Sequence, residues 1–258
     1  MINVRSARVE DIESLELLEK ACWESHLCAS KPELLRRIKQ YPEGQFVIDI
    51  DGEIYGVLYT QRIDSIDDLR KGEFRSQFGL HNPAGSIVQL LAIAVKNYKG
   101  QNIGSNLRDH ALRKARDDPT IACVVAMTRC SRFVENLTEK SGAAAVNLDK
   151  KAIHDTYCEY VHSHRDPTVF FHISGGAKIL EIVSAYRPDD TANAGHAILI
   201  QYDPRSLVGL DSRTLCLQST ELDDNSGERV DLLCSHENIS QEICEEILNI
   251  TDAKDLDI

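Results

Sequence analysis

The sequence predicts an α/β protein of the mixed α+β class, and two observations carry this prediction. Residues 88–95 form a near-continuous apolar run, which is typical of a strand buried on both faces. A short loop with two glycines follows it, and apolar side chains then recur at helical spacing from Leu107 to Ala115. A buried strand that runs through a glycine-bearing loop into a helix is therefore the unit around which we expect the chain to be organised.

Short strands and helices are expected to precede this unit. An apolar alternation predicts a first strand, and two amphipathic segments after it predict helices, the second with Pro32 in its first turn. The pair Asp51-Gly52 is a strong hairpin signal between two further strands. The expected order is a strand at 2–6, helices at 12–22 and from 31, and hairpin strands at 45–50 and 53–62.

After the helix that follows the loop, residues 121–127 read as another buried strand. A helix closed by glycine is expected at 131–142, then a polar loop with a helical turn at 147–165. Three more strands are expected at 168–172, 177–185 and 196–202. The domain would span residues 1–203, followed by an extension at 204–258 with a strand-like start and a final helix capped by Ser240.

Composition limits the classes of function. The 258 residues are 42% hydrophobic and 27% charged, which are globular values. From Asp211 onward the chain carries thirteen acidic and three basic residues, so most of the formal net charge of −12 lies in the extension. This acidity argues against nucleic acid as the partner. The eight cysteines form no C-x-x-C motif or zinc-ligand spacing, and no apolar run is long enough for a membrane span. We expect a cytoplasmic protein with neither a metal nor a membrane partner.

The glycine-bearing loop, Lys99 to Ser105, predicts an anion-binding site. Backbone N–H groups converge at the positive end of a helix, which is a favourable place for a pyrophosphate. The loop is not a P-loop, because no Gly-Lys-Ser/Thr closes it, and it is not G-x-G-x-x-G. Taken alone, the loop could also be an ordinary tight turn before a helix.

The spacing of the loop resembles the acyl-CoA signature of the GNAT (GCN5-related acetyltransferase) superfamily, Arg/Gln-x-x-Gly-x-Gly/Ala, with Gln101 and Gly104 at matching positions. The resemblance implies the GNAT fold, whose mixed sheet has a V-shaped splay between two parallel strands, here 88–95 and 121–127. The pantetheine arm of a CoA thioester would enter that gap. The residues expected to contact the cofactor are Ile93, Val95, Gly100, Gln101, Asn102, Ile103, Gly104 and Ser105.

The last third of the chain narrows the resemblance. The segments 166–177, 185–190 and 195–196 look like the GNAT-like domain of polyketide synthase loading modules, curacin type, and this similarity runs from about Val4 to Asp203. It implies decarboxylation of malonyl-CoA to acetyl-CoA, and also transfer of the acetyl group to an acyl carrier protein. The family's functional tryptophan, threonine, histidine and arginine match Trp23, Thr128, His172 and Arg187.

The chemistry gives each of these four residues a role. Loss of CO2 from a malonyl thioester leaves an enolate, and Thr128 and His172 are suited to stabilise its oxygen or to hold the departing carboxylate out of the thioester plane. Arg187 would recognise that carboxylate without holding it too tightly, because ground-state binding slows its loss. Trp23 would wall the pocket and exclude water.

Structural explanations stay open for each residue: a core histidine, a strand-end hydroxyl, an arginine in a surface turn and a core tryptophan. Two other functions stay open as well. One is an ordinary N-acetyltransferase that uses acetyl-CoA and an amine, although the 88–95 strand offers no carboxylate as its base. The other is a non-catalytic module that binds acyl-CoA or docks a carrier protein.

Overall fold

A seven-stranded sheet forms the centre of the molecule, in the order β1-β2-β3-β4-β5-β7-β6. The computed structural model describes residues 2–25, 27–71, 79–96, 102–141 and 149–207. All neighbouring strands are antiparallel except β4 and β5, which are parallel. The strands are β1 (Ile2–Ser6), β2 (Gln45–Ile50), β3 (Glu53–Ile63), β4 (Ile87–Val95), β5 (Cys123–Thr128), β6 (Lys178–Val183) and β7 (Ala197–Tyr202).

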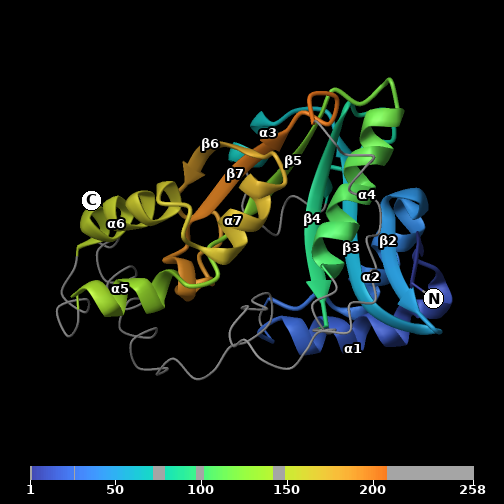
Figure 1. The fold of residues 1–258 in the computed structure, drawn as a ribbon, viewed down its shortest axis with the longest axis horizontal. Helices are drawn as coiled ribbons and strands as arrows, with labels where there is room; N and C mark the ends of the chain where they lie inside the picture. The colour runs from blue at the N-terminus through green and yellow to red at the C-terminus, as the bar shows by residue number, and fades with distance from the viewer. Residues whose placement is uncertain (1, 26, 72–78, 97–101, 142–148, 208–258) are drawn as a thin grey trace, which may run out of the picture.

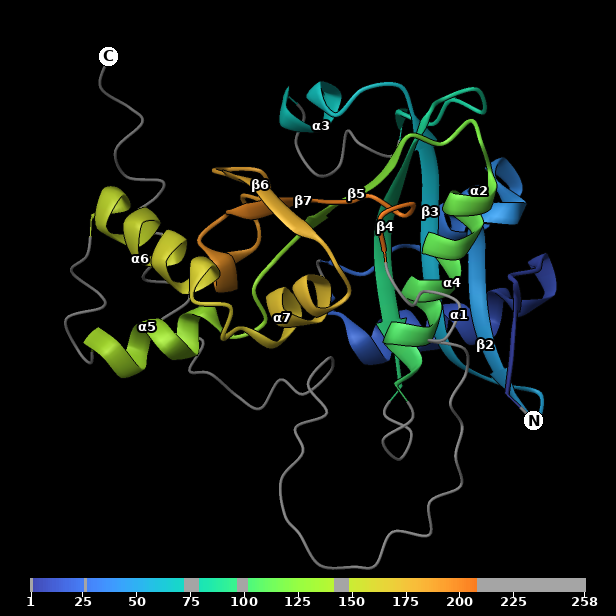
Figure 2. The ribbon, with the colours of Figure 1, turned by 45° about the horizontal axis from the view of Figure 1, so that its top comes forward.

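Helices cover both faces of the sheet. In Figure 1, α4 lies over one face of β2, β3 and β4, and α1 and α2 lie on the other side. Figure 2 shows α5 and α6 side by side at the β6 end of the molecule, with α7 between them and the sheet centre. The helices are α1 (Ile12–Cys22), α2 (Lys31–Gln40), α3 (Asp67–Lys71), α4 (Ile103–Asp117), α5 (Phe133–Ser141), α6 (Lys150–His162) and α7 (Pro167–Ser174), with 3-10 turns at Val9–Asp11, Pro42–Gly44 and Thr191–Asn193.

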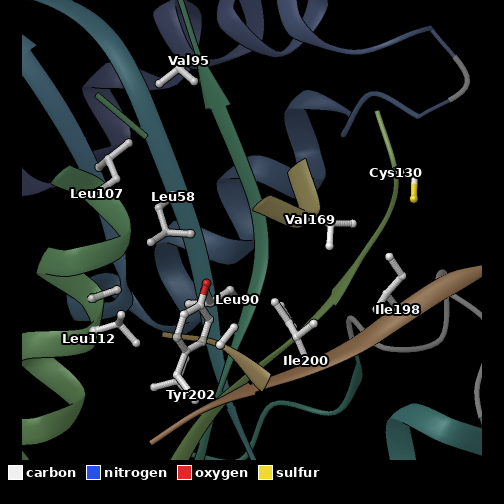
Figure 3. Packing of buried hydrophobic residues seen from close by; sticks show 14 of the residues in the cluster. Leu58, Leu90, Val95, Leu107, Leu112, Cys130, Val169, Ile198, Ile200 and Tyr202 are labelled. Carbon is white, nitrogen blue, oxygen red and sulfur yellow. The ribbon is translucent and has the colours of Figure 1, made fainter. Parts of the chain in front are cut away.

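The splay expected between the two parallel strands is present. Strands β4 and β5 pair over four residues only, from Ile87–Cys123 to Leu90–Ala126, and β4 then continues to Val95. A bulge at Leu91 shifts the register of β4 against β3 at this same point, and a bulge bends the strand that carries it. Figure 3 shows the two strands diverging beyond Leu90, with Val169 of α7 between them.

Close packing holds the start of α4 against β3. A Cβ atom added to Gly56 of β3 would lie 2.7 Å from Ile103 Cγ2 and 3.0 Å from Leu107 Cδ1, both in α4. Only glycine therefore permits this approach of helix to strand. The same helix buries Leu107 and Leu112 in the large hydrophobic core that also holds Tyr202 of β7 (Figure 3).

Most elements expected from the sequence are confirmed, but the segment 168–172 is helical and not a strand. Its aromatic and β-branched residues favour a strand, yet Asp166 caps a helix here by accepting the N–H groups of Thr168 and Val169. Pro167 occupies the first helical position, where its missing N–H costs nothing. Capping and tertiary contacts thus override strand propensity, and His172 lies on α7.

The segment 147–165 was also predicted wrongly, as a polar loop with a helical turn. It contains the 13-residue helix α6, whose buried residues Ile153, Tyr157, Tyr160 and Val161 recur at helical spacing beneath a polar exposed face. Asp149 caps it by accepting the N–H of Ala152. Helix α3 was not expected. The extension was expected to begin like a strand at 204–219, but residues 204–206 form a turn. The rest of that segment and the expected final helix lie outside the described residues, from 208 onward.

Candidate active site

A cavity of about 120 Å³ lies where β4 and β5 diverge, and all four functional residues suggested by the sequence line it. Trp23 comes from the end of α1, Thr128 from the end of β5, His172 from α7, and Arg187 from the turn between β6 and β7. The cavity is small beside the roughly 300–1,000 Å³ of pockets that hold drug-sized ligands. Its size therefore suits a short acyl group.

The residues expected to bind CoA divide into three groups. Ile93 lines the cavity, and Val95 stands at the end of β4, where its carbonyl accepts the thiol of Cys22 at 3.3 Å. Asn102, Ile103, Gly104 and Ser105 begin helix α4, whose first-turn N–H groups lie outside the helical hydrogen-bond ladder and suit a phosphate. Gly100 and Gln101 lie outside the described residues.

Asp166 joins the two elements that carry Thr128 and His172. One carboxylate oxygen accepts the N–H groups of Ser131 (2.8 Å) and Arg132 (2.9 Å), just beyond β5. The other accepts the first two N–H groups of α7, and the side chain is fully buried. A charged carboxylate that accepts four backbone N–H groups is a strong anchor. It fixes the end of β5 relative to α7, and so fixes Thr128 relative to His172.

His172 is an uncharged imidazole with a defined orientation. Burial, with a smaller contribution from the nearby charge of Arg108, lowers its pKa to about 3. Its Nδ1 atom lies 2.6 Å from the hydroxyl of Tyr202, whose pKa burial raises above its ordinary value. Within the described part of the chain this is the one hydrogen bond of that hydroxyl, and we assign the phenol as its donor because the reverse direction would leave the phenol O–H without an acceptor. With Nδ1 as the acceptor, the ring proton belongs on Nε2, where it can be donated.

Two arginines and one carboxylate form the charged part of the site. Arg187 is 8% exposed, and burial lowers its pKa to about 10, so the guanidinium stays cationic at neutral pH. Arg129, directly after Thr128, lines the same cavity, and its Nε lies 3.0 Å from a carboxylate oxygen of Asp190. An acyl group with a free carboxylate would meet positive charge here.

Trp23 ends α1, where its N–H donates to the carbonyl of Glu19 at 2.9 Å. Its side chain packs against the core cluster between α1, α2 and the sheet, and also borders the cavity. The tryptophan therefore lies between that core and the cavity. Phe171 of α7 lines the cavity too, and its ring contacts the guanidinium of Arg108 at 4.6 Å.

Sequence reasoning missed four residues that shape the site: Arg129, Asp166, Asp190 and Tyr202. Arg129 and Asp190 adjoin motifs that had been recognised, since they follow Thr128 and belong to the Arg187-Pro188-Asp189-Asp190 segment. Asp166 precedes Pro167, which is a cap signal. Nothing local marks Tyr202, because its partner His172 is 30 residues away in the chain.

Among the described residues, no helix combines the length and apolarity that crossing a membrane requires. No group of three or more His, Cys, Asp or Glu side chains among them is arranged to hold a metal ion.

Comparison with known proteins places the chain in a family. No family model matches the sequence. The structure resembles the GphF GNAT-like decarboxylase, solved with isobutyryl-CoA, at a TM-score of 0.70 and 34% identity, covering 79% of this chain and 100% of that one. It also resembles the loading GNATL domain of CurA from Lyngbya majuscula, at a TM-score of 0.69 and 30% identity, covering 80% and 98%.

A curated relative extends beyond this chain. The probable hydrolase YhcX of Bacillus subtilis (strain 168) is 28% identical over 214 residues, which are 78% of this chain but 38% of that protein. The chain therefore spans well under half of the length of this relative. The two structural matches cover almost the whole of their partners at 30% identity or more. The chain thus belongs to the GNAT superfamily and is of the same type as the GNAT-like domains of GphF and of the CurA loading module.

Proposed function

We propose that this protein decarboxylates malonyl-CoA to acetyl-CoA and passes the acetyl group to an acyl carrier protein as a starter unit for polyketide synthesis. One observation carries the proposal: Trp23, Thr128, His172 and Arg187 line a single acyl-sized cavity at the splay of the sheet. The descriptions of two relatives support it, since one is a decarboxylase bound to a CoA thioester and the other a loading domain.

The reaction needs no external base. The bond between C2 and the carboxylate carbon breaks, CO2 departs, and the electron pair moves through C2 onto the thioester oxygen. The Nε2–H of His172 and the hydroxyl of Thr128 donate to that oxygen as its negative charge grows, and such donors are each worth roughly 10²–10³ in rate. A proton from solvent then adds to C2, which gives acetyl-CoA.

The protonation state of His172 fits this role. An imidazole with a pKa of about 3 stays neutral, and the hydroxyl of Tyr202 holds its Nδ1 as an acceptor. A neutral imidazole N–H is a suitable donor to an enolate, because it does not protonate the carbon prematurely. Arg187 would orient the carboxylate, and Trp23 would keep water away, which favours uncharged CO2 as the leaving group.

Transfer of the acetyl group would follow when the thiol of a carrier's phosphopantetheine arm attacks the acetyl carbonyl and displaces CoA as its thiol. The same donors, Thr128 and His172, face the carbonyl oxygen in this step. The gap between β4 and β5 is the expected path for either pantetheine arm.

Mass spectrometry of malonyl-CoA incubated with the protein, with and without a carrier protein, tests the proposal. We expect acetyl-CoA without any acceptor, acetylated carrier when the carrier is present, and loss of both products in His172→Ala and Thr128→Val. Asp149→Asn serves as the control and should keep full activity, because Asp149 is an exposed helix cap that does not line the cavity. Intact malonyl-CoA under every condition would refute decarboxylation, and acetyl-CoA without acetylated carrier would refute the transfer.

A further inference from the structure

We propose that Arg129 and Asp190 set the strength of carboxylate binding in the cavity, with Asp190 offsetting one of two cations so that a single net positive charge faces the substrate. This inference rests on the proposed function and deepens it. It defines the substrate class as CoA thioesters whose short acyl group bears one free carboxylate. It also gives Asp190 a task in the site, although its own carboxylate has the wrong charge to bind such a substrate.

The first support is the position of Arg129. It follows Thr128 at the end of β5 and lines the same cavity as Arg187. Its side chain is 11% exposed, and its Nε lies 3.0 Å from Oδ2 of Asp190, which is 1% exposed. Two guanidinium groups thus line one cavity, and a buried carboxylate lies against one of them.

The second support is the rigid placement of Asp190. The side-chain amide of Asn193 donates to its carboxylate at 3.2 Å. The amide oxygen of Asn193 accepts the N–H of Cys130 at 2.9 Å and the hydroxyl of Tyr157 at 3.2 Å. All these groups are buried. The network ties the turn that carries Asp190 to the end of β5, so the carboxylate cannot move away from Arg129 into solvent.

The third support is electrostatic contact with Arg187. The N–H of Asp190 donates to the carbonyl of Arg187 at 2.9 Å, so both residues belong to one tight turn. Burial lowers the pKa of Arg187 most strongly, the charge of Asp190 opposes this by raising it, and the charge of Arg129 lowers it. Asp190 and Arg129 are therefore both close enough to Arg187 to influence its charge, in opposite directions.

A decarboxylase needs moderate and not maximal attraction at this position. The carboxylate must be bound and oriented, yet it leaves as uncharged CO2, so every interaction with its charge that is lost in the transition state raises the barrier. One net positive charge balances a monoanionic acyl group. Two net charges would bind the ground state too tightly, and a neutral site would lose the substrate.

Three substitutions change the net charge with little change in shape. Asp190→Asn raises it by one and keeps an oxygen to accept from Asn193, whereas Arg129→Gln lowers it by one. The double variant restores the wild-type value. Asp189→Asn, next to Asp190 but exposed, is the control for charge alone. A unit charge in such a site, at an effective dielectric constant of about 20, changes the affinity for an anion by about 10- to 100-fold.

The binding probe is S-(2-carboxyethyl)-CoA, which has the carboxylate but lacks the carbonyl that accepts the electron pair, so it cannot react. S-propyl-CoA is its uncharged counterpart. Calorimetry on the whole protein should show the carboxylate ligand binding about 10- to 100-fold tighter to Asp190→Asn and correspondingly weaker to Arg129→Gln. The double variant should return to wild type, and S-propyl-CoA should bind all variants alike. With malonyl-CoA, Asp190→Asn should lower both KM and kcat.

The alternative role for the pair is purely structural, and it gives a different pattern. Weaker binding of both ligands by Asp190→Asn, or a double variant worse than either single one, would overturn the inference. Because the binding probe does not react, these binding results test the inference independently of whether the protein is a decarboxylase. A wild-type protein that turns over malonyl-CoA while Asp190→Asn binds no tighter refutes the inference alone. If the variants bind S-(2-carboxyethyl)-CoA in the expected order but the wild-type protein does not turn over malonyl-CoA, the proposed function is refuted and this inference is not.

Discussion

Replacing Tyr202 with phenylalanine tests whether His172 acts as an oriented N–H donor. The substitution removes the hydroxyl that lies 2.6 Å from Nδ1 and leaves the ring in its fully buried place. A neutral buried hydrogen bond is worth about 0.5–1.5 kcal/mol. If that energy holds the imidazole in its reactive tautomer, its loss lowers kcat by about 2- to 13-fold, because each 1.36 kcal/mol is a factor of ten in rate. His172→Ala removes the donor itself and should cost roughly 10²–10³.

The assay measures kcat and KM for malonyl-CoA, together with the ¹⁵N chemical shifts of His172. We expect kcat to fall while KM stays close to wild type, because the donor strengthens its contact only as charge develops on the oxygen. The ¹⁵N shifts should show that the Nε2–H tautomer is no longer uniform. Tyr59→Phe is a matched control, since this tyrosine is equally buried and its hydroxyl has no hydrogen-bond partner among the described residues. A folded Tyr202→Phe protein with unchanged kcat and an unchanged tautomer would refute the reasoning.

Three further predictions concern stability, CoA binding and pH. Asp166→Asn should lower the free energy of unfolding by about 2 kcal/mol in denaturant titrations, because four backbone N–H groups lose a charged acceptor. The control Asp149→Asn, at an exposed helix cap, should lower it by less than about 1 kcal/mol. Equal losses in the two variants would contradict the anchoring role of Asp166. Gly56→Ala should push Ile103 and the start of α4 outward, which should weaken CoA binding in calorimetry and lower the free energy of unfolding by about 1–3 kcal/mol. The control Gly79→Ala should match wild type, because a Cβ atom added there meets nothing within 4 Å. Burial lowers the pKa of His172 from 6.5 to about 3, so between these pH values the unfolded chain binds a proton that the folded protein does not. The contribution of His172 to the free energy of unfolding is therefore full above pH 6.5 and falls as the pH drops towards 3. Unfolding curves should show a smaller loss of stability in acid for His172→Gln, and a fall in kcat with a midpoint near pH 6.5 would contradict a neutral histidine.

The sequence was informative where periodicity and spacing are local. The buried strands β4 and β5, the hairpin at Asp51-Gly52 and helix α4 were all predictable from apolar patterns and turn residues. The four candidate site residues were chosen because they match a family pattern, and the structure brings all four to one cavity. Their grouping depends on the splay of β4 from β5, which no local pattern specifies.

Two helices show where local reasoning fails. Residues 168–172 have strand-like composition, and only the cap at Asp166 and packing against the core make them α7. Helix α6 has a regular apolar face that many charged residues obscure. The consequence for the site is direct: on a helix, Val169 and His172 lie on the same side and are both buried, as they would not be on a strand. His172 can thereby reach Tyr202 and line the cavity.

The contacts that tune the site are all long-range. Tyr202 reaches His172 from β7, Asp190 reaches Arg129 across 61 positions of sequence, and Asp166 reaches back to Ser131. Such pairs are fixed by tertiary packing, so a single sequence shows the residue types but not the partners. The sequence therefore indicates candidate residues for the site, and the structure supplies the partners of those residues.

The most direct test of the central claim is a time course of malonyl-CoA with the protein and no acceptor, with the carboxylate carbon labelled with ¹³C. Labelled CO2 and acetyl-CoA should appear in equal amounts, at a rate that falls at least about 100-fold in His172→Ala. Release of free CoA and malonate would show a thioester hydrolase instead. Unchanged malonyl-CoA would contradict decarboxylation by this cavity altogether.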